Sequence, residues 1–330
     1  MKKKTTIVDV ARAVGVSPST VSHAISGKRE ISTAVKQRIF EKIRELDYRP
    51  NFFAQAIKSS STRLVGIIAD ECCNPGTAQL IDTLSMELAR HSYEAVIDLA
   101  GLNLEKGREM LRRFPTGLVD GIINLLPQID SNEAELLCGA VPVVTLLRDK
   151  GAPLHLDYEG MARRLLEYLW DLGHRRIGYI ASRTRRYGLP DPAVKVYTAF
   201  MEEHRQPYAG LVVEGQDSIE SGMTGAETIF RREPVSAIFT GNDQMAFGVY
   251  RWAYEKKISI PEQLSVIGFD DVPQAATMIP PLTTFRFPVR EVAEHAVRLL
   301  LAKQQKEVLS REPRVLEIEM VKRSSTSVKS

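Results

Sequence analysis

The sequence predicts an α/β protein: a small all-α N-terminal domain followed by a larger core built on parallel, doubly wound sheets. Three observations lead to this prediction. The first 49 residues contain three amphipathic helical patterns, short apolar runs alternate with helical stretches from Leu64 onward, and charge is distributed unevenly. Buried strands that alternate with helices are typical of parallel sheets covered on both faces. A chain of 330 residues, 44% of them hydrophobic, is long enough for two or three folding units.

The first predicted helix begins after Thr6, which can serve as its N-cap with Asp9 three residues later. It ends at Gly15. Its apolar side chains recur at the spacing of one helical face. They are Ile7, Val10, Ala11 and Val14.

The second predicted helix has Ser17 as its N-cap and Pro18 at its first position, where the missing N–H costs nothing. It ends at Gly27, and a third helix begins at Ser32. Apolar faces consist of Val21, Ala24 and Ile25 in the second helix and of Val35, Ile39, Ile43 and Leu46 in the third. The short turn between the first two helices predicts a helix-turn-helix domain over residues 1–49.

The outward face of the second helix carries small or hydrogen-bonding side chains. They are Pro18, Ser19, Ser22, His23 and Ser26. A recognition helix presents such a face to the major groove and directs its N-terminal N–H groups toward phosphate. The pattern of side chains alone does not distinguish such a recognition face from a polar face that only contacts solvent.

The charge distribution distinguishes a DNA-binding face from a face that only contacts solvent. Residues 1–63 contain 13 Lys and Arg against 5 Asp and Glu, so this segment carries +8 while the whole chain carries only +3. A small basic module indicates a polyanionic partner. Together with the helix-turn-helix, the charge predicts double-stranded DNA as that partner.

Residues 50–62 form a linking segment, with a short helical pattern from Asn51 to Lys58 and a Ser- and Thr-rich end. A helix of this length is marginal in isolation. The core then follows as residues 63–330. Its predicted strands are Leu64–Ala69, Ala95–Leu99, Gly121–Leu126, Val141–Leu147, Arg176–Ala181, Ala237–Thr240 and Leu264–Phe269. So many strands indicate two lobes, with ligands bound beyond the carboxyl ends of the strands.

Two of these strand ends carry carboxylates. Asn242 and Asp243 follow one strand, and Asp270 follows Phe269 at the end of another. A carboxylate at such a place can accept hydrogen bonds from a hydroxylated ligand. It can equally cap the next helix or turn.

Other features exclude several classes of protein. Cys72, Cys73 and Cys138 form neither a disulfide framework nor a set of metal ligands, so we expect free thiols in a reducing cytosol. The basic N-terminus lacks the apolar segment of a signal peptide, and no run of 18 apolar residues occurs. We expect a cytoplasmic protein with no membrane association, metal or cofactor.

Residues 5–51 read TTIVDVARAVGVSPSTVSHAISGKREISTAVKQRIFEKIRELDYRPN. This segment resembles, without gaps, the DNA-binding region of the LacI/GalR (lactose-repressor) family. The core motifs VDGIINL, LGHRRIGYI, GND, GFDD and PPLTTFR resemble that family too, as does the terminal KRSST. The resemblance implies a periplasmic-binding-protein-like core of two lobes crossed three times by the chain. The N-lobe would comprise about 63–156 and 287–316, and the C-lobe about 157–286 and 317–330.

The resemblance also assigns DNA contacts. It implies base reading by Pro18, Ser19 and His23, and phosphate contacts that orient the helix from Thr6, Ser17, Thr20, Ser22 and Ser26. His23 departs from the arginine that is usual in the family. A histidine cannot make the bidentate fork of arginine to guanine, so the base preference at that position stays open.

In the family, the segment after the helix-turn-helix is a hinge that becomes helical only in the dimer on DNA. A leucine then wedges into the minor groove, and Ile57 occupies that position here. An apolar wedge unstacks a base step and kinks the duplex. Ile57 is stiffer because it is β-branched, and an ordinary linker contact is the alternative. The predicted hinge contacts are Asn51, Ala54, Gln55 and Ile57.

In the family, the equivalents of Asn242 and Asp270 face the effector. We predict an effector site formed by Asn242, Asp243, Phe269 and Asp270.

At three places the sequence departs from the residues with which the family binds a sugar. The arginine that binds sugar hydroxyls is Ala193 here, the stacking aromatic is Asp217, and the aromatic pair after Asn-Pro is Gly76-Thr77. These changes remove a fork donor and stacking surfaces. Whether the effector is a sugar therefore stays open. Arg183, Arg185 and Arg186 could instead bind an anionic metabolite, or simply be solvated.

The resemblance implies a sequence-specific transcriptional regulator, which we expect to be a repressor. It would bind a pseudo-palindromic operator as a homodimer, with a small-molecule effector in the cleft between the lobes. The chain end from Lys322 onward lacks the leucine heptads that could form a tetramer.

Two alternatives come from other classes of protein. A protein that only binds a solute does not explain the basic helical N-terminus. An α/β enzyme with an accessory DNA-binding domain does not fit the absence of HExxH, GxSxG, P-loop and GxGxxG motifs. We therefore expect no enzymatic activity.

Overall fold

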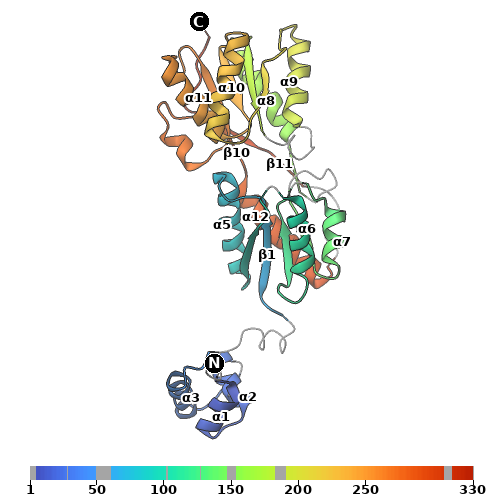
Figure 1. Ribbon diagram of the computed structural model, residues 1–330, viewed down its shortest axis with the longest axis vertical. Coiled ribbons are helices and arrows are strands. Elements are labelled where there is room, and N and C mark those ends of the chain that lie inside the picture. Colours follow the sequence, from blue (N-terminus) through green and yellow to red (C-terminus); the bar gives the residue numbers. More distant parts are fainter. Residues whose placement is uncertain are drawn as a thin grey trace. The chain divides into compact units, whose positions relative to one another are not determined.

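The computed structural model describes residues 5–27, 29–49, 61–101, 103–126, 128–146, 154–182, 191–307 and 314–329. The chain divides into two compact units, residues 1–62 and 63–330. The first unit consists of helices where it is described, and the second combines helices with strands (Figure 1).

The first unit contains the three predicted helices, α1 (Ile7–Val14), α2 (Pro18–Ser26) and α3 (Thr33–Glu45). Thr6 and Asp9 cap α1 reciprocally, and Gly15 ends it with φ 77°, a left-handed conformation that favours glycine. Ser17 caps α2, and Ser32 precedes α3 without a capping bond from its side chain. The prediction of a three-helix domain is confirmed.

The three helices pack around one small core. Arg38 Nη2 donates a hydrogen bond of 2.8 Å to the carbonyl of Val14, which ties α3 to the end of α1. Predicted apolar residues on each helix are buried. The core consists of Val10, Ala11, Val14, Val21, Ala24, Ile39 and Tyr48.

The second unit begins with a parallel sheet in the order β2-β1-β3-β4. Its strands are β1 (Leu64–Ala69), β2 (Glu94–Leu99), β3 (Gly121–Asn124) and β4 (Val143–Thr145). Helices α5 (Pro75–Arg90) and α12 (Val289–Gln305) pack on one face, and α6 (Leu104–Arg113) and α7 (Ser131–Cys138) on the other. Neighbouring side chains alternate between these faces: Ile67 packs in the core under α5 and α12, whereas Ile68 packs under α6 and α7.

A second sheet has the order β12-β10-β9-β8-β6-β7. Its strands are β6 (Ile177–Ala181), β7 (Val212–Glu214), β8 (Ala237–Thr240), β9 (Ser265–Asp270), β10 (Thr283–Arg286) and β12 (Glu319–Val321). The edge strand β12 runs antiparallel to β10 while the other pairs are parallel. The expectation of parallel sheets therefore needs one correction at this edge.

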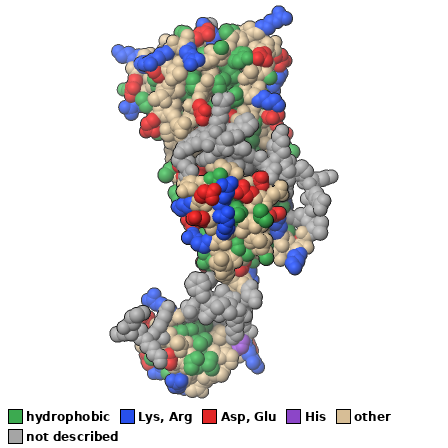
Figure 2. All heavy atoms as spheres, turned by 45° about the vertical axis from the view of Figure 1, so that its right-hand side comes forward, with side chains coloured by type: hydrophobic (Ala, Val, Ile, Leu, Met, Phe, Trp, Pro, Cys, Tyr) green, Lys and Arg blue, Asp and Glu red, His purple; other side chains and the backbone are tan. Residues whose placement is uncertain are grey.

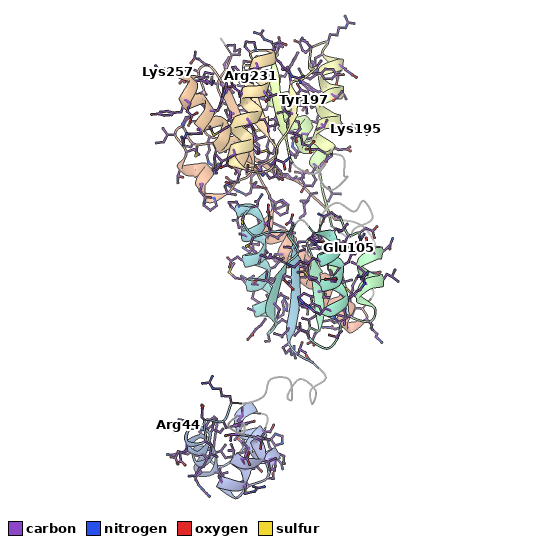
Figure 3. The ribbon with its side chains drawn as sticks, in the orientation of Figure 1. Arg44, Glu105, Lys195, Tyr197, Arg231 and Lys257 are labelled. Atoms are coloured by element: carbon purple, nitrogen blue, oxygen red, sulfur yellow. The ribbon has the colours of Figure 1, made fainter. Side chains whose placement is uncertain are left out.

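Four helices and a 3-10 turn surround the second sheet. The helices are α8 (Tyr158–Asp171), α9 (Pro192–Glu203), α10 (Ile219–Arg232) and α11 (Asp243–Lys256), and the turn is η2 (Pro273–Thr277). Tyr197 of α9 lies toward the interior in Figure 3, where its hydroxyl donates to the carbonyl of Ile177 at 2.7 Å. Burial raises the pKa of Tyr197.

Short strands β5 (Leu154–Leu156) and β11 (Arg314–Leu316) pair in parallel as a third, two-stranded sheet. The chain passes between the two larger sheets from β5 to α8, from β10 to α12, and from β11 to β12. The carboxyl ends of strands in the second sheet and the start of α5 beside the first sheet border a common cavity.

Among the described residues, no helix is both long and apolar enough to cross a membrane. Basic and acidic side chains are intermixed over the surface of the second unit in the view of Figure 2. The three cysteines are free, as expected.

Candidate functional site

The first candidate site is the outward face of α2. Ser17 Oγ accepts a hydrogen bond of 3.1 Å from the backbone N–H of Thr20, and it lies 2.7 Å from Ser19 Oγ. These hydroxyls gather at the N-terminus of the helix, where the partial positive charge of the helix dipole favours an anion. Ser17, Pro18 and Ser19 are exposed.

The opposite face of α2 anchors it to the domain, because Val21 and Ala24 are buried in the three-helix core. Ser22 and His23 are half-exposed between the two faces. Exposed basic side chains occur on α1, on α3 and on the segments that border the helices of this unit. They include Arg12, Arg29, Lys36, Arg38, Arg44 and Arg49. The unit therefore offers a rigid helix with free polar side chains in a positive environment.

The second candidate site is a cavity of about 210 Å³ in the second unit. Asn74, Gly76 and Thr77 reach it from the start of α5, while Asn242 and Asp270 reach it from strand ends of the second sheet. Aromatic side chains make up much of the remaining wall. They are Tyr158, Tyr179, Phe239, Phe269 and Phe287.

Three carboxylates line this cavity, and two of them are satisfied by the protein. Asp191 accepts 2.7 Å from the hydroxyl of Tyr179 and 2.9 Å from the backbone N–H of Ala193. Asp217 accepts 2.8 Å from Ser182 Oγ and 3.1 Å from Asn242 Nδ2.

Asp270, the third carboxylate, is half-buried and accepts no side-chain hydrogen bond or ion pair from the described residues. It lies against α5, since a Cβ added to Gly76 would be 3.1 Å from Asp270 Oδ2. Burial, followed by the charges of Asp243 and Asp217, raises the pKa of Asp270 well above its ordinary value. Its φ of 113° is strained for a residue other than glycine. A strained, shifted acid in a cavity is typical of a functional site.

Asp270→Asn is expected to stabilise the ligand-free protein. A carboxyl whose folded pKa lies above its unfolded pKa destabilises the fold at every pH above the unfolded value, about 4 for aspartate. The destabilisation grows as the pH rises toward the folded pKa. The variant should therefore unfold at least about 2–4 °C higher than the parent at pH 8, and the difference should shrink at pH 5.

Thermal unfolding of the full chain at both pH values checks this prediction. Glu109→Gln on α6 removes an exposed carboxylate and should change little at either pH. A loss of stability in Asp270→Asn at pH 8 would show that the ionised carboxylate contributes favourably instead.

Comparison with known proteins identifies the family. Residues 6–51 match the family described as bacterial regulatory proteins, lacI family, and residues 166–326 match the periplasmic binding protein-like domain. The HTH-type transcriptional repressor PurR of Edwardsiella ictaluri is 30% identical over 304 residues, which cover 90% of this chain and 89% of that protein. The chain belongs to the LacI family. Catabolite control protein A of Priestia megaterium is 29% identical over 311 residues, or 92% of this chain and 94% of that protein.

A solved structure supports the same fold. The lac repressor dimer bound to operator and the anti-inducer ONPF has a TM-score of 0.85 and 24% identity, and the match covers 98% of this chain and 100% of that one. The predicted fold class, a helix-turn-helix unit with a periplasmic-binding-protein-like core, is confirmed. The protein is a DNA-binding transcriptional regulator of the LacI family.

Within this LacI-family core, three predicted effector residues line the cavity: Asn242, Phe269 and Asp270. Asn242 also caps α11, because its Oδ1 accepts 2.9 Å from the backbone N–H of Met245. The side-chain amide of Asn242 therefore has three roles. It donates to Asp217, caps α11 and lines the cavity.

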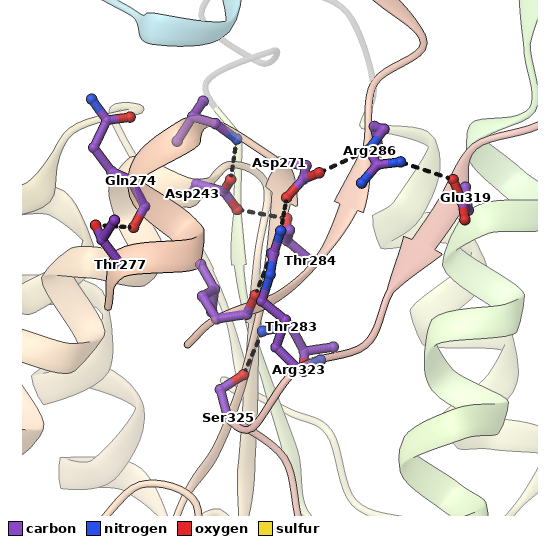
Figure 4. A network of polar contacts seen from close by, with 12 residues as sticks. Asp243, Asp271, Gln274, Thr277, Thr283, Thr284, Arg286, Glu319, Arg323 and Ser325 are labelled. Carbon is purple, nitrogen blue, oxygen red and sulfur yellow. Dashed lines mark hydrogen bonds and ion pairs between the residues drawn. The ribbon is translucent and has the colours of Figure 1, made fainter. Parts of the chain in front are cut away.

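The prediction that Asp243, the fourth residue, lines the effector site needs correction. Asp243 is fully buried and does not border the cavity. Its Oδ1 accepts 2.6 Å from the hydroxyl of Thr284, and its Oδ2 accepts 2.9 Å from the backbone N–H of Val272 (Figure 4). Burial raises the pKa of Asp243 to about 7. The side chain joins the start of α11 to β10, which is a structural role.

The three positions that depart from the family's sugar-binding pattern, Gly76, Ala193 and Asp217, all border the cavity. Sequence reasoning missed Asp191, Tyr158 and Tyr179. Only Asp191 carried a local signal, because it precedes Pro192 at a helix start. Several predicted residues lie outside the described part of the chain. They are the hinge residues Asn51, Ala54, Gln55 and Ile57, the side chain of Ser26, and Arg183, Arg185 and Arg186.

Proposed function

We propose that this LacI-family regulator is a cytoplasmic repressor that binds a pseudo-palindromic operator as a homodimer, with an affinity modulated by a small molecule in the core cavity. The observation that carries the proposal is the exposed polar face of α2, fixed by Val21 and Ala24 in a strongly basic unit. A dimer with two-fold symmetry requires two symmetric half-sites. The relative from Edwardsiella ictaluri is named a repressor, and the lac repressor structure contains a dimer on its operator.

Each part of the first unit and the hinge has a separate task in this proposal. Pro18, Ser19 and His23 read bases in the major groove, because Pro18 and Ser19 are exposed on α2 and His23 is half-exposed beside them. Thr6, Ser17, Thr20, Ser22 and Ser26 bind phosphates and fix the register of the helix. Asn51, Ala54, Gln55 and Ile57 act in the minor groove, with Ile57 as an apolar wedge.

The cavity couples a ligand to DNA binding in this proposal because both lobes line it. Gly76 comes from α5 on the first sheet, and Asn242 and Asp270 come from the second sheet. A ligand that contacts both lobes binds one lobe arrangement more tightly than another. It therefore shifts the population of that arrangement and with it the affinity for operator.

His23→Ala is expected to remove base preference at one position of each half-site while leaving non-specific binding intact. Loss of a direct base contact costs roughly 1–3 kcal/mol of discrimination. The measurement is selection of binding sites from a random duplex library by the full-length protein at two salt concentrations, followed by sequencing. The parent should select a pseudo-palindrome, and the variant should select the same palindrome with one degenerate position.

Gln37→Ala is the matched control, since Gln37 is exposed on α3 of the same unit. It should select the parental sequence. If the parent itself showed only salt-sensitive binding without sequence preference, the protein would act as a non-specific DNA binder, and the proposal of a sequence-specific repressor would be wrong.

A further inference from the structure

The described wall of the cavity carries negative charge without a compensating positive charge. Its ionisable acids are Asp191, Asp217 and Asp270, and no Lys, Arg or His is among its described residues. Asp191 and Asp217 accept hydrogen bonds from neighbouring side chains. Asp270 is the exception, and its carboxylate faces the same space.

Donors on the segments around Asp270 are used elsewhere. The backbone N–H groups of Gly76 and Thr77 both point to Asn74 Oδ1, at 2.8 and 3.4 Å. Arg286, which stands opposite Asp270 in the register of β10 and β9, and Arg323 both pair with Asp271, at 2.8 and 2.6 Å. A carboxylate that is partly removed from water and has no hydrogen-bond donor is costly, and a cation that pairs with it offsets this cost.

The rest of the wall favours a cation attached to an apolar group. Tyr158 and Phe269 lie with their ring centroids 5.9 Å apart, and Phe239 stacks on Tyr179 at 4.0 Å. Aromatic faces attract organic cations and provide apolar contact area. An anion would instead meet Asp191 and Asp217 and no cationic side chain among the described residues of the wall.

We propose that the effector carries a protonated amine that pairs with Asp270 and an apolar portion that packs on Phe269 and Tyr158. This inference rests on the proposed function, because it takes the cavity to be the effector site. It differs from both possibilities that the sequence left open, a neutral sugar and an anionic metabolite.

The test is calorimetric titration of the full-length protein at pH 7.5 with three probes of one shape: benzylammonium, benzyl alcohol and benzoate. We expect benzylammonium to bind at least about tenfold more tightly than benzyl alcohol, because a charge-assisted hydrogen bond is added. Benzoate should not bind measurably. Glucose and glucose 6-phosphate, tested at the same concentrations, represent the neutral sugar and the anion.

Asp270→Asn should reduce the affinity for benzylammonium about tenfold and leave that for benzyl alcohol unchanged. Glu109→Gln, which removes an exposed carboxylate on α6, should change neither. If Asp270→Asn does not fold, the parent still provides a test. The affinity for benzylammonium should fall as the pH is lowered and Asp270 is protonated, with Asp217 and Asp243 as its nearest ionisable neighbours, whereas that for benzyl alcohol should not.

Tightest binding by benzoate, glucose or glucose 6-phosphate, or no binding by benzylammonium, would overturn the inference. The operator selection described above keeps the two proposals separate. A protein that selects a pseudo-palindrome but does not bind benzylammonium is a repressor with a different class of effector. A protein that binds the amine at Asp270 but no specific DNA sequence would contradict the proposed function alone.

Discussion

Arg323→Ala is expected to lower the free energy of unfolding of the core by about 3 kcal/mol. Arg323 Nη2 pairs with Asp271 Oδ1 at 2.6 Å, and Nη1 donates 2.7 Å to the carbonyl of Leu282. The Asp271 side chain is only 7% exposed, and its other partner, Arg286, is a half-exposed side chain (Figure 4). Removing Arg323 leaves the buried carboxylate of Asp271 with only the flexible side chain of Arg286 as a partner. A buried carboxylate that has lost its partner strongly destabilises the folded state.

Urea unfolding of the full chain, followed by tryptophan fluorescence, measures this loss. Both tryptophans, Trp170 and Trp252, lie on helices of the second sheet, α8 and α11, so they report on the lobe that contains Arg323. The control is Arg290→Ala. Its pair with Glu294 joins adjacent turns of α12 in solvent, so its removal should cost far less than the removal of Arg323. Equal losses in the two variants would mean that Asp271 does not depend on Arg323.

Gly248→Ala is expected to destabilise the core by about 3 kcal/mol, because α10 and α11 touch through their backbones. A Cβ at Gly248 would lie 2.0 Å from the carbonyl oxygen of Ile219 and 2.8 Å from Cα of Gly222. A Cβ at Gly222 would in turn lie 2.0 Å from the carbonyl oxygen of Met245. Neither contact involves a side chain that could rotate away, so the helices must separate.

The control for this variant is Gly107→Ala in α6. An added Cβ there meets the end of the Leu126 side chain, which can change its rotamer, and alanine gains about 1 kcal/mol of helix propensity over glycine. Its stability should stay within about 1 kcal/mol of the parent, as measured by the same urea titration. A Gly248→Ala protein as stable as Gly107→Ala would show that α10 and α11 can move apart without cost.

Arg323→Ala and Gly248→Ala both change segments that lie next to cavity-lining residues. Asp271 follows Asp270 directly, and α11 begins at Asp243, next to Asn242. The ion pairs of Asp271 hold the strand ends that carry two of the cavity-lining side chains. Loss of the network should therefore weaken ligand binding as well as stability, because a displaced carboxylate no longer faces the ligand.

Local signals in the sequence were sufficient for the helix-turn-helix unit. Thr6 and Ser17 cap their helices as predicted, Gly15 and Gly27 end them in the left-handed conformation, and the apolar spacing predicts the buried face of α2. These features depend on residues within one or two helical turns of one another. For the same reason the exposure of Pro18 and Ser19 at the start of α2 could be predicted, whereas Ser22 and His23 are only half-exposed.

The longer strands of the core could also be predicted, because strands buried on both faces read as continuous apolar runs. The three-residue strands β7 (Val212–Glu214) and β11 (Arg314–Leu316) were not predicted. Their residues are too few to form a pattern, and their pairing partners are distant in the chain. The antiparallel edge strand β12 is fixed by its contact with β10, about 36 positions earlier, and by no local feature.

The sequence by itself determined the family, the helix-turn-helix and the strand ends that border the cavity. Only the tertiary structure decided which of those polar side chains face the cavity. Asp243 and Asp270 both follow strands, yet Asp243 turns inward to Thr284 and Val272 while Asp270 lines the cavity. The difference arises from hydrogen-bond donors supplied by segments far away in sequence, and these donors meet Asp243 and not Asp270. Packing thus leaves one carboxylate of the cavity without a hydrogen-bond partner among the described residues, and the proposed amine effector rests on that side chain.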